Sequence, residues 1–209
     1  MINYNHVVQF QHIFWDEQLK SAKTIVDATA GNGHDLLYLA QHCLPGSTLW
    51  GIDKQTKAIE ASTKRLHTEC ARPDITYHLV HGTHEDIILA TGNPATAQND
   101  GPTTNTKYNT AITNIDLLIF NLGYLPGSDH TMMTKPDSTI QAIKGGLDLL
   151  NPKGLITIVT YPGTPEGERE DEAVCEFIST LPQKSYDVAT WKLVNQANKP
   201  PILYIIKGR

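Results

Sequence analysis

The chain has 209 residues, of which 40% are hydrophobic and 19% are charged, and its formal net charge is −5. This composition is typical of a globular protein with a full hydrophobic core, and it excludes the disordered and fibrous classes. The acidic balance argues against a strongly basic nucleic-acid-binding protein, but it permits a local basic patch.

Hydropathy and cysteine usage argue against membrane-spanning, secreted, disulfide-rich and zinc-binding proteins. The apolar runs are far shorter than the roughly 20 residues that a membrane helix needs, and the N-terminus lacks the basic and apolar segments of a signal peptide. The three cysteines are odd in number and widely spaced, which is typical of neither a disulfide framework nor a zinc site. We expect a cytoplasmic protein that binds no metal and no membrane.

Short apolar runs alternate with segments of helical periodicity along the chain. In chain order, we predict a helix over residues 7–21, a strand over 24–28, a helix over 34–43, a strand over 47–53, a helix over 57–70, strands over 75–80 and 115–120, a helix over 138–150 with an exit turn at 151–154, a strand over 155–161, a helix over 168–181, and a closing strand pair over 185–194 and 201–208. This alternation predicts an α/β fold in one domain over residues 1–209, with a mostly parallel seven-stranded sheet and helices on both faces.

Two segments stand outside this alternation. Residues 91–114 are rich in Thr, Asn, Gly and Pro and have no apolar periodicity, so we predict a surface loop, either a plain insertion or a functional lid. The N-terminal helical segment, residues 1–22, either covers the sheet or contacts RNA through His6, His12 and Lys20.

A glycine turn follows the first predicted strand in the sequence "DATAGNGHD". Ligands of open parallel sheets bind beyond the carboxyl ends of the strands, and Gly31 and Gly33 allow the backbone to approach a ligand closely. A dinucleotide fingerprint needs a third glycine where this chain has Leu36, and the sequence has no Gly-Lys pair of a phosphate-binding Walker loop here. The turn therefore favours a nucleoside ligand without phosphates, such as S-adenosylmethionine.

Asp53 ends the second predicted strand, 20 residues beyond Gly33. A carboxylate at this position accepts hydrogen bonds from a ribose diol; the alternative is that Asp53 caps the following helix. The third strand ends in "HGTHED", which places Thr83 and His84 at the same rim. There His84 either contacts an adenine or is an ordinary surface histidine.

The fourth strand leads directly into "NLGYLPG", residues 121–127. This sequence is similar to the Asn-Pro-Pro-Tyr type motif of amino-group methyltransferases. The carbonyl of Asn121 can hydrogen-bond an attacking amine and the ring of Tyr124 can hold a flat target, so that orientation supplies much of the rate. The alternative is a tight loop without a catalytic role.

The sequence "NQANKPP", residues 195–201, lies between the last two predicted strands. Asn195, Gln196 and Asn198 form an amide cluster that is suited to reading the edge of a base. Amides before two prolines are also ordinary turn residues, so both interpretations stay open.

Five motifs in order carry a family resemblance: "DATAGNGHD", "GIDKQ", "NLGYLPG" with "TKPDSTIQAI", "YPGTPEG" and "NQANKPP". They resemble the small bacterial methyltransferases labelled rRNA methylases, a family associated with methylating 5-aminomethyl-2-thiouridine at the tRNA wobble position. The resemblance implies a class I, Rossmann-like methyltransferase with S-adenosylmethionine as donor and the tRNA anticodon loop as partner.

The resemblance also implies roles for individual residues. The residues expected to bind the cofactor are Asp27, Gly31, Asn32, Gly33, His34, Asp53, Gln55, Thr83 and His84. Those expected to face the acceptor amine are Asn121 and Tyr124, and those expected to contact the substrate nucleotide are Tyr161, Asn195, Gln196 and Asn198.

The chain departs from the family pattern after the fifth strand. The usual loop reads Tyr-His-Gly-His-Pro-Glu-Gly, whereas Pro162 and Thr164 occupy the two histidine positions here. If a histidine removes a proton from the substrate ammonium in the family, this chain uses another base or takes the neutral amine. Lys54 and Thr83 also look like substitutions within otherwise matching motifs.

The activity that we expect is N-methylation of the 5-aminomethyl group of the wobble uridine. The alternatives are a methyltransferase for rRNA or for a small amine, which the net charge of −5 suits, and a nicotinamide-dependent oxidoreductase, against which Leu36 argues. A binding module without activity is a further alternative. The sequence leaves the oligomeric state open, with a homodimer among the options.

Overall fold

The computed structural model describes residues 7–70, 72–92, 112–123 and 134–209. Seven strands form one sheet in the order β3-β2-β1-β4-β5-β7-β6. The strands are β1 (Thr24–Asp27), β2 (Thr48–Asp53), β3 (Thr76–His81), β4 (Ile115–Asn121), β5 (Leu150–Thr160), β6 (Tyr186–Trp191) and β7 (Ile202–Gly208). Strands β1 to β5 pair in parallel, and β7 is antiparallel to both β5 and β6. The predicted α/β fold with its mostly parallel sheet is confirmed.

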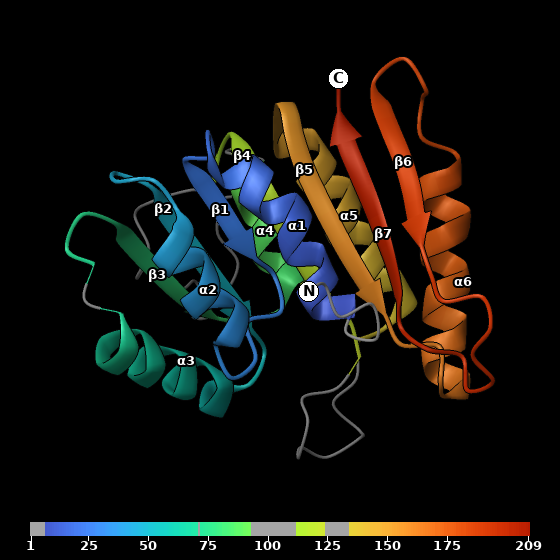
Figure 1. Cartoon of the computed structure of the whole chain (residues 1–209), viewed down its shortest axis with the longest axis horizontal. Helices are drawn as coiled ribbons and strands as arrows, with labels where there is room; N and C mark the ends of the chain where they lie inside the picture. The colour runs from blue at the N-terminus through green and yellow to red at the C-terminus, as the bar shows by residue number, and fades with distance from the viewer. Residues whose placement is uncertain (1–6, 71, 93–111, 124–133) are drawn as a thin grey trace, which may run out of the picture.

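Helices cover both faces of the sheet. They are α1 (Val7–Leu19), α2 (His34–His42), α3 (Thr56–Glu69), α4 (His84–Gly92), α5 (Pro136–Leu149) and α6 (Pro165–Ser179). One apolar core lies between the sheet and α1, α2 and α3, and a second lies between the sheet and α4, α5 and α6. Figure 1 shows α1 and α2 in front of the sheet and α4 and α5 behind it.

The central strand β4 is apolar at every position from Leu117 to Phe120 because helices cover both of its faces. Leu117 and Ile119 belong to the core under α1, α2 and α3, whereas Leu118 and Phe120 belong to the core under the other three helices. All four side chains are fully buried. A parallel strand that is covered on both faces needs apolar residues at every position, rather than at alternate ones.

Helix α1 covers the sheet, as one of the two interpretations of the N-terminal segment predicts. The indole of Trp15 donates to the hydroxyl of Thr157 on β5 at 3.0 Å. His12 stacks on Tyr38 of α2, with 3.8 Å between the ring centroids. The exposed Lys20 pairs with Glu17, and His6 lies outside the described residues.

The structure adds one helix that we did not predict. Helix α4 begins at His84, directly after Thr83, whose hydroxyl donates to the carboxylate of Asp86 at 2.7 Å and accepts from its backbone N–H at 3.3 Å. A Thr followed three residues later by an acid is a capping box, so the sequence did carry a start signal. Of the predicted 91–114 loop, residues 93–111 lie outside the described part.

Strand β5 also begins earlier than predicted. Its pairing with β4 passes from Ile115 with Leu150 directly to Leu117 with Leu155. Residues 151–154, predicted as an exit turn, therefore bulge out of the ladder, and Lys153 adopts a left-handed φ of 62° there.

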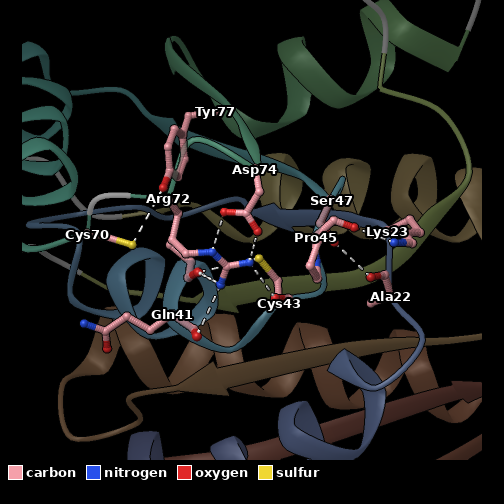
Figure 2. Close-up of polar contacts among 11 residues, drawn as sticks. Ala22, Lys23, Gln41, Cys43, Pro45, Ser47, Cys70, Arg72, Asp74 and Tyr77 are labelled. Atoms are coloured by element: carbon pink, nitrogen blue, oxygen red, sulfur yellow. Dashed lines mark hydrogen bonds and ion pairs between the residues drawn. The ribbon is translucent and has the colours of Figure 1, made fainter.

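Arg72 secures the carboxyl end of α2. Figure 2 shows its guanidinium between Asp74 and the last turn of this helix, where it donates to the carbonyl oxygens of Ala40 at 3.1 Å and Cys43 at 3.2 Å. The same group donates to Asp74 at 2.6 and 2.8 Å. These contacts satisfy carbonyls that a helix end otherwise leaves unpaired, and a cation there complements the helix dipole.

Candidate active site

A cavity of about 1190 Å³ opens at the carboxyl ends of β1, β2, β4 and β5. It lies where the strand order reverses between β1 and β4, which is the usual ligand position in an open parallel sheet. Of the 15 residues to which the family resemblance assigns a role, ten line it: Gly31, Asn32, His34, Asp53, Gln55, Thr83, His84, Asn121, Tyr161 and Asn198.

The glycine turn forms one wall of the cavity. Gly31 and Gly33 have φ values of 51° and 76°, which favour glycine. A Cβ on Gly33 would lie 2.8 Å from the Cα of Ser62 on α3, so close packing also requires glycine there. Arg65 of α3 donates to the backbone carbonyl of Asn32 at 2.9 Å. Helix α3 therefore packs against the glycine turn and fixes its position at the cavity wall.

Asp53 connects the glycine turn to the start of α3. Its two carboxylate oxygens accept the backbone N–H groups of Gly31 at 2.9 Å and of Gln55 at 2.8 Å. Gln55 is the N-cap residue of α3, so Asp53 supports the helix start from two residues earlier rather than capping it directly. Each carboxylate oxygen keeps a further acceptor site for a ligand hydroxyl.

Asp27 lies below the glycine turn and does not line the cavity. It is 1% exposed, and one of its oxygens accepts the backbone N–H of Thr29 at 3.0 Å. The other oxygen has no hydrogen-bond partner among the described residues. Burial, reinforced by the nearby carboxylate of Asp35, raises the pKa of Asp27 well above its usual range.

His84 is not a surface residue. It is 9% exposed, its ring meets Phe120 edge to face, and it lines the cavity. Its Nε2 is buried and has no hydrogen-bond partner in the described part of the chain; the carboxylate of Glu85 lies 3.6 Å away. Burial lowers the pKa of His84. A neutral imidazole with an unpaired nitrogen in a cavity wall fits a ligand that offers a hydrogen bond.

Asn121 lies at the centre of a network that joins β4, α1 and α2. Its side-chain NH₂ donates to Asp35 at 2.8 Å, and its carbonyl oxygen accepts from Gln11 at 3.1 Å. The backbone N–H of Asn121 donates to the hydroxyl of Thr29 at 2.7 Å. The Nε2 of His12 lies 3.4 Å from the other oxygen of Asp35. The sequence alone did not indicate Gln11 or Asp35 as site residues, although Asp35 stands in the motif "DATAGNGHD".

Tyr124 lies outside the described residues, whereas Tyr161 lines the cavity together with Gly123. Its ring would be 3.5 Å from a Cβ on Gly123, and it is 38% exposed. Loss of solvation, reinforced by Asp35, raises the pKa of Tyr161 to about 12, so the phenol is neutral and can donate a hydrogen bond.

The three amide residues before β7, Asn195, Gln196 and Asn198, do not line the same cavity. Asn198 lines the large cavity, together with Lys199 and two prolines. Gln196 lines a separate cavity of about 380 Å³ beside α6, and Asn195 lines neither cavity. The sequence could not separate these neighbours because the turn that precedes β7 decides which side chain faces which cavity.

Thr164, at one of the two histidine positions of the family loop, is the N-cap of α6. Its hydroxyl accepts the backbone N–H of Gly167 at 3.1 Å. Behind this loop, the buried carboxylate of Glu170 accepts the hydroxyls of Thr134 and Thr139, both at 2.7 Å. Burial raises the pKa of Glu170. Thr164 therefore caps α6, and Glu170 joins α6 to α5 and to the segment before it.

The strand order, the glycine turn and the acid at the end of β2 define the class of protein. A methyltransferase from Streptococcus mutans, solved in complex with S-adenosylhomocysteine, has the same fold, with a TM-score of 0.78 and 28% identity over 100% of both chains. The cradle of the glycine turn, the carboxylate of Asp53 and the unpaired nitrogen of His84 fit this type of cofactor. The chain is an S-adenosylmethionine-dependent methyltransferase. The alternative hypothesis of a nicotinamide-dependent oxidoreductase is therefore rejected.

The family follows from the sequence comparison. The family described as "Putative rRNA methylase" matches residues 49–207. A solved rRNA methylase from Clostridium thermocellum, described in similar words, is 33% identical over 100% of both chains, with a TM-score of 0.81. The chain belongs to this rRNA methylase family. It is also similar to a chloroplastic tRNA (mnm5s2U34)-methyltransferase of Arabidopsis thaliana, at 28% identity over 94% of this chain and 67% of that protein.

Two features are missing from the part of the chain that the structure describes. Its residues form no cluster of three or more His, Cys, Asp or Glu side chains that could hold a metal ion. Its helices are too short or too polar for any of them to cross a membrane.

Proposed function

We propose that this methyltransferase transfers a methyl group to the 5-aminomethyl nitrogen of a wobble uridine, with or without the 2-thio group, in tRNA. The observation that carries the proposal is the Asn121 amide, held at the rim of the donor cavity by Asp35 and Gln11. The name of the Arabidopsis relative supports the nucleotide and its position.

The size of the cavity supports a second ligand beside the cofactor. A pocket for one ligand is typically about 300–1,000 Å³, and this cavity is about 1190 Å³. We assign the part beside Asp53, Gln55, Thr83 and His84 to the adenosine of the donor, and the part beside Asn32 and His34 to its methionine end.

The remaining part of the cavity is our acceptor site. Asn121, Tyr161 and Asn198 face it, and we extend it to Tyr124 on the sequence motif alone. We leave Asn195 and Gln196 out of the site because they do not line this cavity. S-adenosylmethionine supplies a methyl group on a sulfonium, and the residues of the chain orient the amine toward it.

Orientation requires an acceptor for the N–H bonds of a neutral amine. The carbonyl oxygen of Asn121 keeps one acceptor site beyond its contact with Gln11. The amine must lose a proton before it attacks, and Pro162 and Thr164 supply no imidazole at the loop after β5. We therefore expect the rate to rise with pH toward the pKa of the amine itself.

The RNA can present this nucleotide at low cost. Anticodon-loop bases are single-stranded, so turning one of them into a cavity breaks little stacking and no duplex pairing. Three lysines, Lys54, Lys135 and Lys199, line the cavity beside the carboxylates of Asp35, Asp53 and Glu85. We expect the lysines to contact the RNA phosphates.

The test is nucleoside analysis of tRNA by mass spectrometry in a strain that lacks the protein. We expect the unmethylated aminomethyl uridine to accumulate, and the methylated form to return with the wild-type gene but not with Asn121→Ala. Normal methylation in the deletion strain would refute the tRNA substrate and favour rRNA or a small amine.

A further inference from the structure

We infer that Gln11, on helix α1, is a positioning residue for methyl transfer: it holds the carbonyl end of the Asn121 amide, which Asp35 orients, in the place where it receives the substrate amine. The inference rests on the proposed function, because Gln11 acts through Asn121 and not on the substrate. It gives the N-terminal helix a role in the reaction beyond covering the sheet.

The hydrogen bonds around Asn121 admit one orientation of its amide. A carboxylate only accepts, so the group that faces Asp35 at 2.8 Å must be the NH₂ of Asn121. The carbonyl oxygen then faces Gln11, whose Nε2 donates to it at 3.1 Å. A flipped Asn121 amide would oppose two oxygens on the Asp35 side. Asp35 therefore keeps an acceptor, and not a donor, on the other side of the amide, and Gln11 holds that acceptor in place.

The contribution of Gln11 to protein stability does not by itself explain why a glutamine occupies this position. Gln11 is fully buried, and its Oε1 has no hydrogen-bond partner among the described residues. An unpaired buried carbonyl destabilises a folded protein. A methionine has nearly the same length and would fill the space without leaving a carbonyl unpaired. The contact that a methionine cannot make is the one with Asn121.

Helix α1 offers a matched control seven residues later. Gln18 is also buried on the sheet side of the helix, and its Nε2 donates to the carbonyl of Asp116 at 2.9 Å and to that of Lys153 at 3.3 Å. Its Oε1 accepts from Lys207 at 2.6 Å. These partners lie at the start of β4, at the bulge of β5 and on β7, away from the cavity. Gln18 therefore serves the fold, with both ends of its amide paired.

The test compares Gln11→Met with Gln18→Met, using purified protein, labelled donor and total tRNA from the deletion strain. For Gln11→Met we expect kcat to fall at least tenfold, with KM for the donor and the affinity for S-adenosylhomocysteine within twofold of wild type, and an equal or higher melting temperature. For Gln18→Met we expect a lower melting temperature and an unchanged kcat for the folded protein.

A double-mutant cycle separates a role through Asn121 from a general effect on packing. In an Asn121→Ala background, Gln11→Met should cause no further loss of kcat, because its partner is gone. Full kcat in the single Gln11→Met variant, or an equal further loss in the Asn121→Ala background, would overturn the inference alone. No methyl transfer from wild-type protein to tRNA, or full kcat in Asn121→Ala, would instead overturn the proposed function.

Discussion

Asp53 shapes the cavity wall, and we propose that the same carboxylate binds the ribose of the cofactor. Its carboxylate holds the backbone N–H groups of Gly31 and Gln55, so it fixes the shape of two turns on the cavity wall. The same oxygens face the cavity with acceptor sites to spare. A carboxylate that its own backbone already orients needs no rearrangement when a ribose diol arrives.

Replacing Asp53 therefore affects both binding and stability. We expect Asp53→Ala to weaken binding of S-adenosylhomocysteine about 10- to 100-fold, since hydrogen bonds to a charged group contribute about 1.5–3 kcal/mol. The melting temperature should also fall, and Asp53→Asn should restore part of it. Isothermal titration calorimetry checks the affinity, with the exposed Lys57→Ala on α3 as control. Unchanged affinity in Asp53→Ala would place the cofactor elsewhere.

His84 gives the folded chain a dependence on pH. Burial lowers its pKa below the unfolded value of about 6.5. In the window between the lowered pKa and about 6.5, the unfolded state binds the proton and the folded state does not. The free energy of unfolding should therefore decrease as the pH falls through this window.

The variant His84→Gln isolates this contribution. We expect denaturant unfolding between pH 5 and pH 8 to show a weaker loss of stability at acidic pH in His84→Gln than in the wild type. Burial also lowers the pKa of His78, but that residue is present in both proteins, so it cancels in the difference. An identical pH dependence in the two proteins would show that His84 is not a buried neutral imidazole.

At the scale of elements, helix α2 is held at both ends by different chemistry. Its amino end follows the glycine turn of the cavity, and Arg72 binds the carbonyls of its carboxyl end (Figure 2). We expect Arg72→Met to lower the free energy of unfolding by about 1–3 kcal/mol, because it leaves helix carbonyls and Asp74 without their donor.

A matched arginine checks this expectation. Arg169 also pairs with a carboxylate, Glu166, but on the exposed surface of α6, so Arg169→Met should change stability by less than about 0.5 kcal/mol. Chemical denaturation measures both variants. Equal effects of the two substitutions would mean that Arg72 is an ordinary surface ion pair.

The sequence predicted the elements with a clear period and missed those whose identity depends on contacts. The seven strands followed from apolar runs, yet α4 was missed because its periodicity is short and adjoins a polar loop, although Thr83 and Asp86 signalled its start. The strand boundary at residues 151–154 depends on pairing with β4, which no local pattern specifies. Gln11 stands on the buried face of a predicted helix, and only the fold brings it to Asn121.

At the scale of the whole molecule, the two faces of the sheet contribute different parts of the site. Helices α1, α2 and α3, on one face, support the glycine turn and Asn121. On the other face, Thr83 directly precedes α4, His84 begins α4, and Glu170 lies on α6. The three lysines Lys54, Lys135 and Lys199 lie on the cavity between these halves. The carboxylates of Asp35, Asp53 and Glu85 line the same cavity, so it carries both signs of charge in a chain whose net charge is −5.

The proposed methyl transfer from S-adenosylmethionine to the wobble aminomethyl group can be measured directly in a transfer assay with purified protein. The assay uses labelled donor and tRNA from the deletion strain, followed by nucleoside mass spectrometry. We predict one added methyl group on the aminomethyl nitrogen of the wobble uridine, at a rate that rises with pH toward the pKa of the amine. Label on a different nucleotide, or none on tRNA while S-adenosylhomocysteine still binds, would contradict the account.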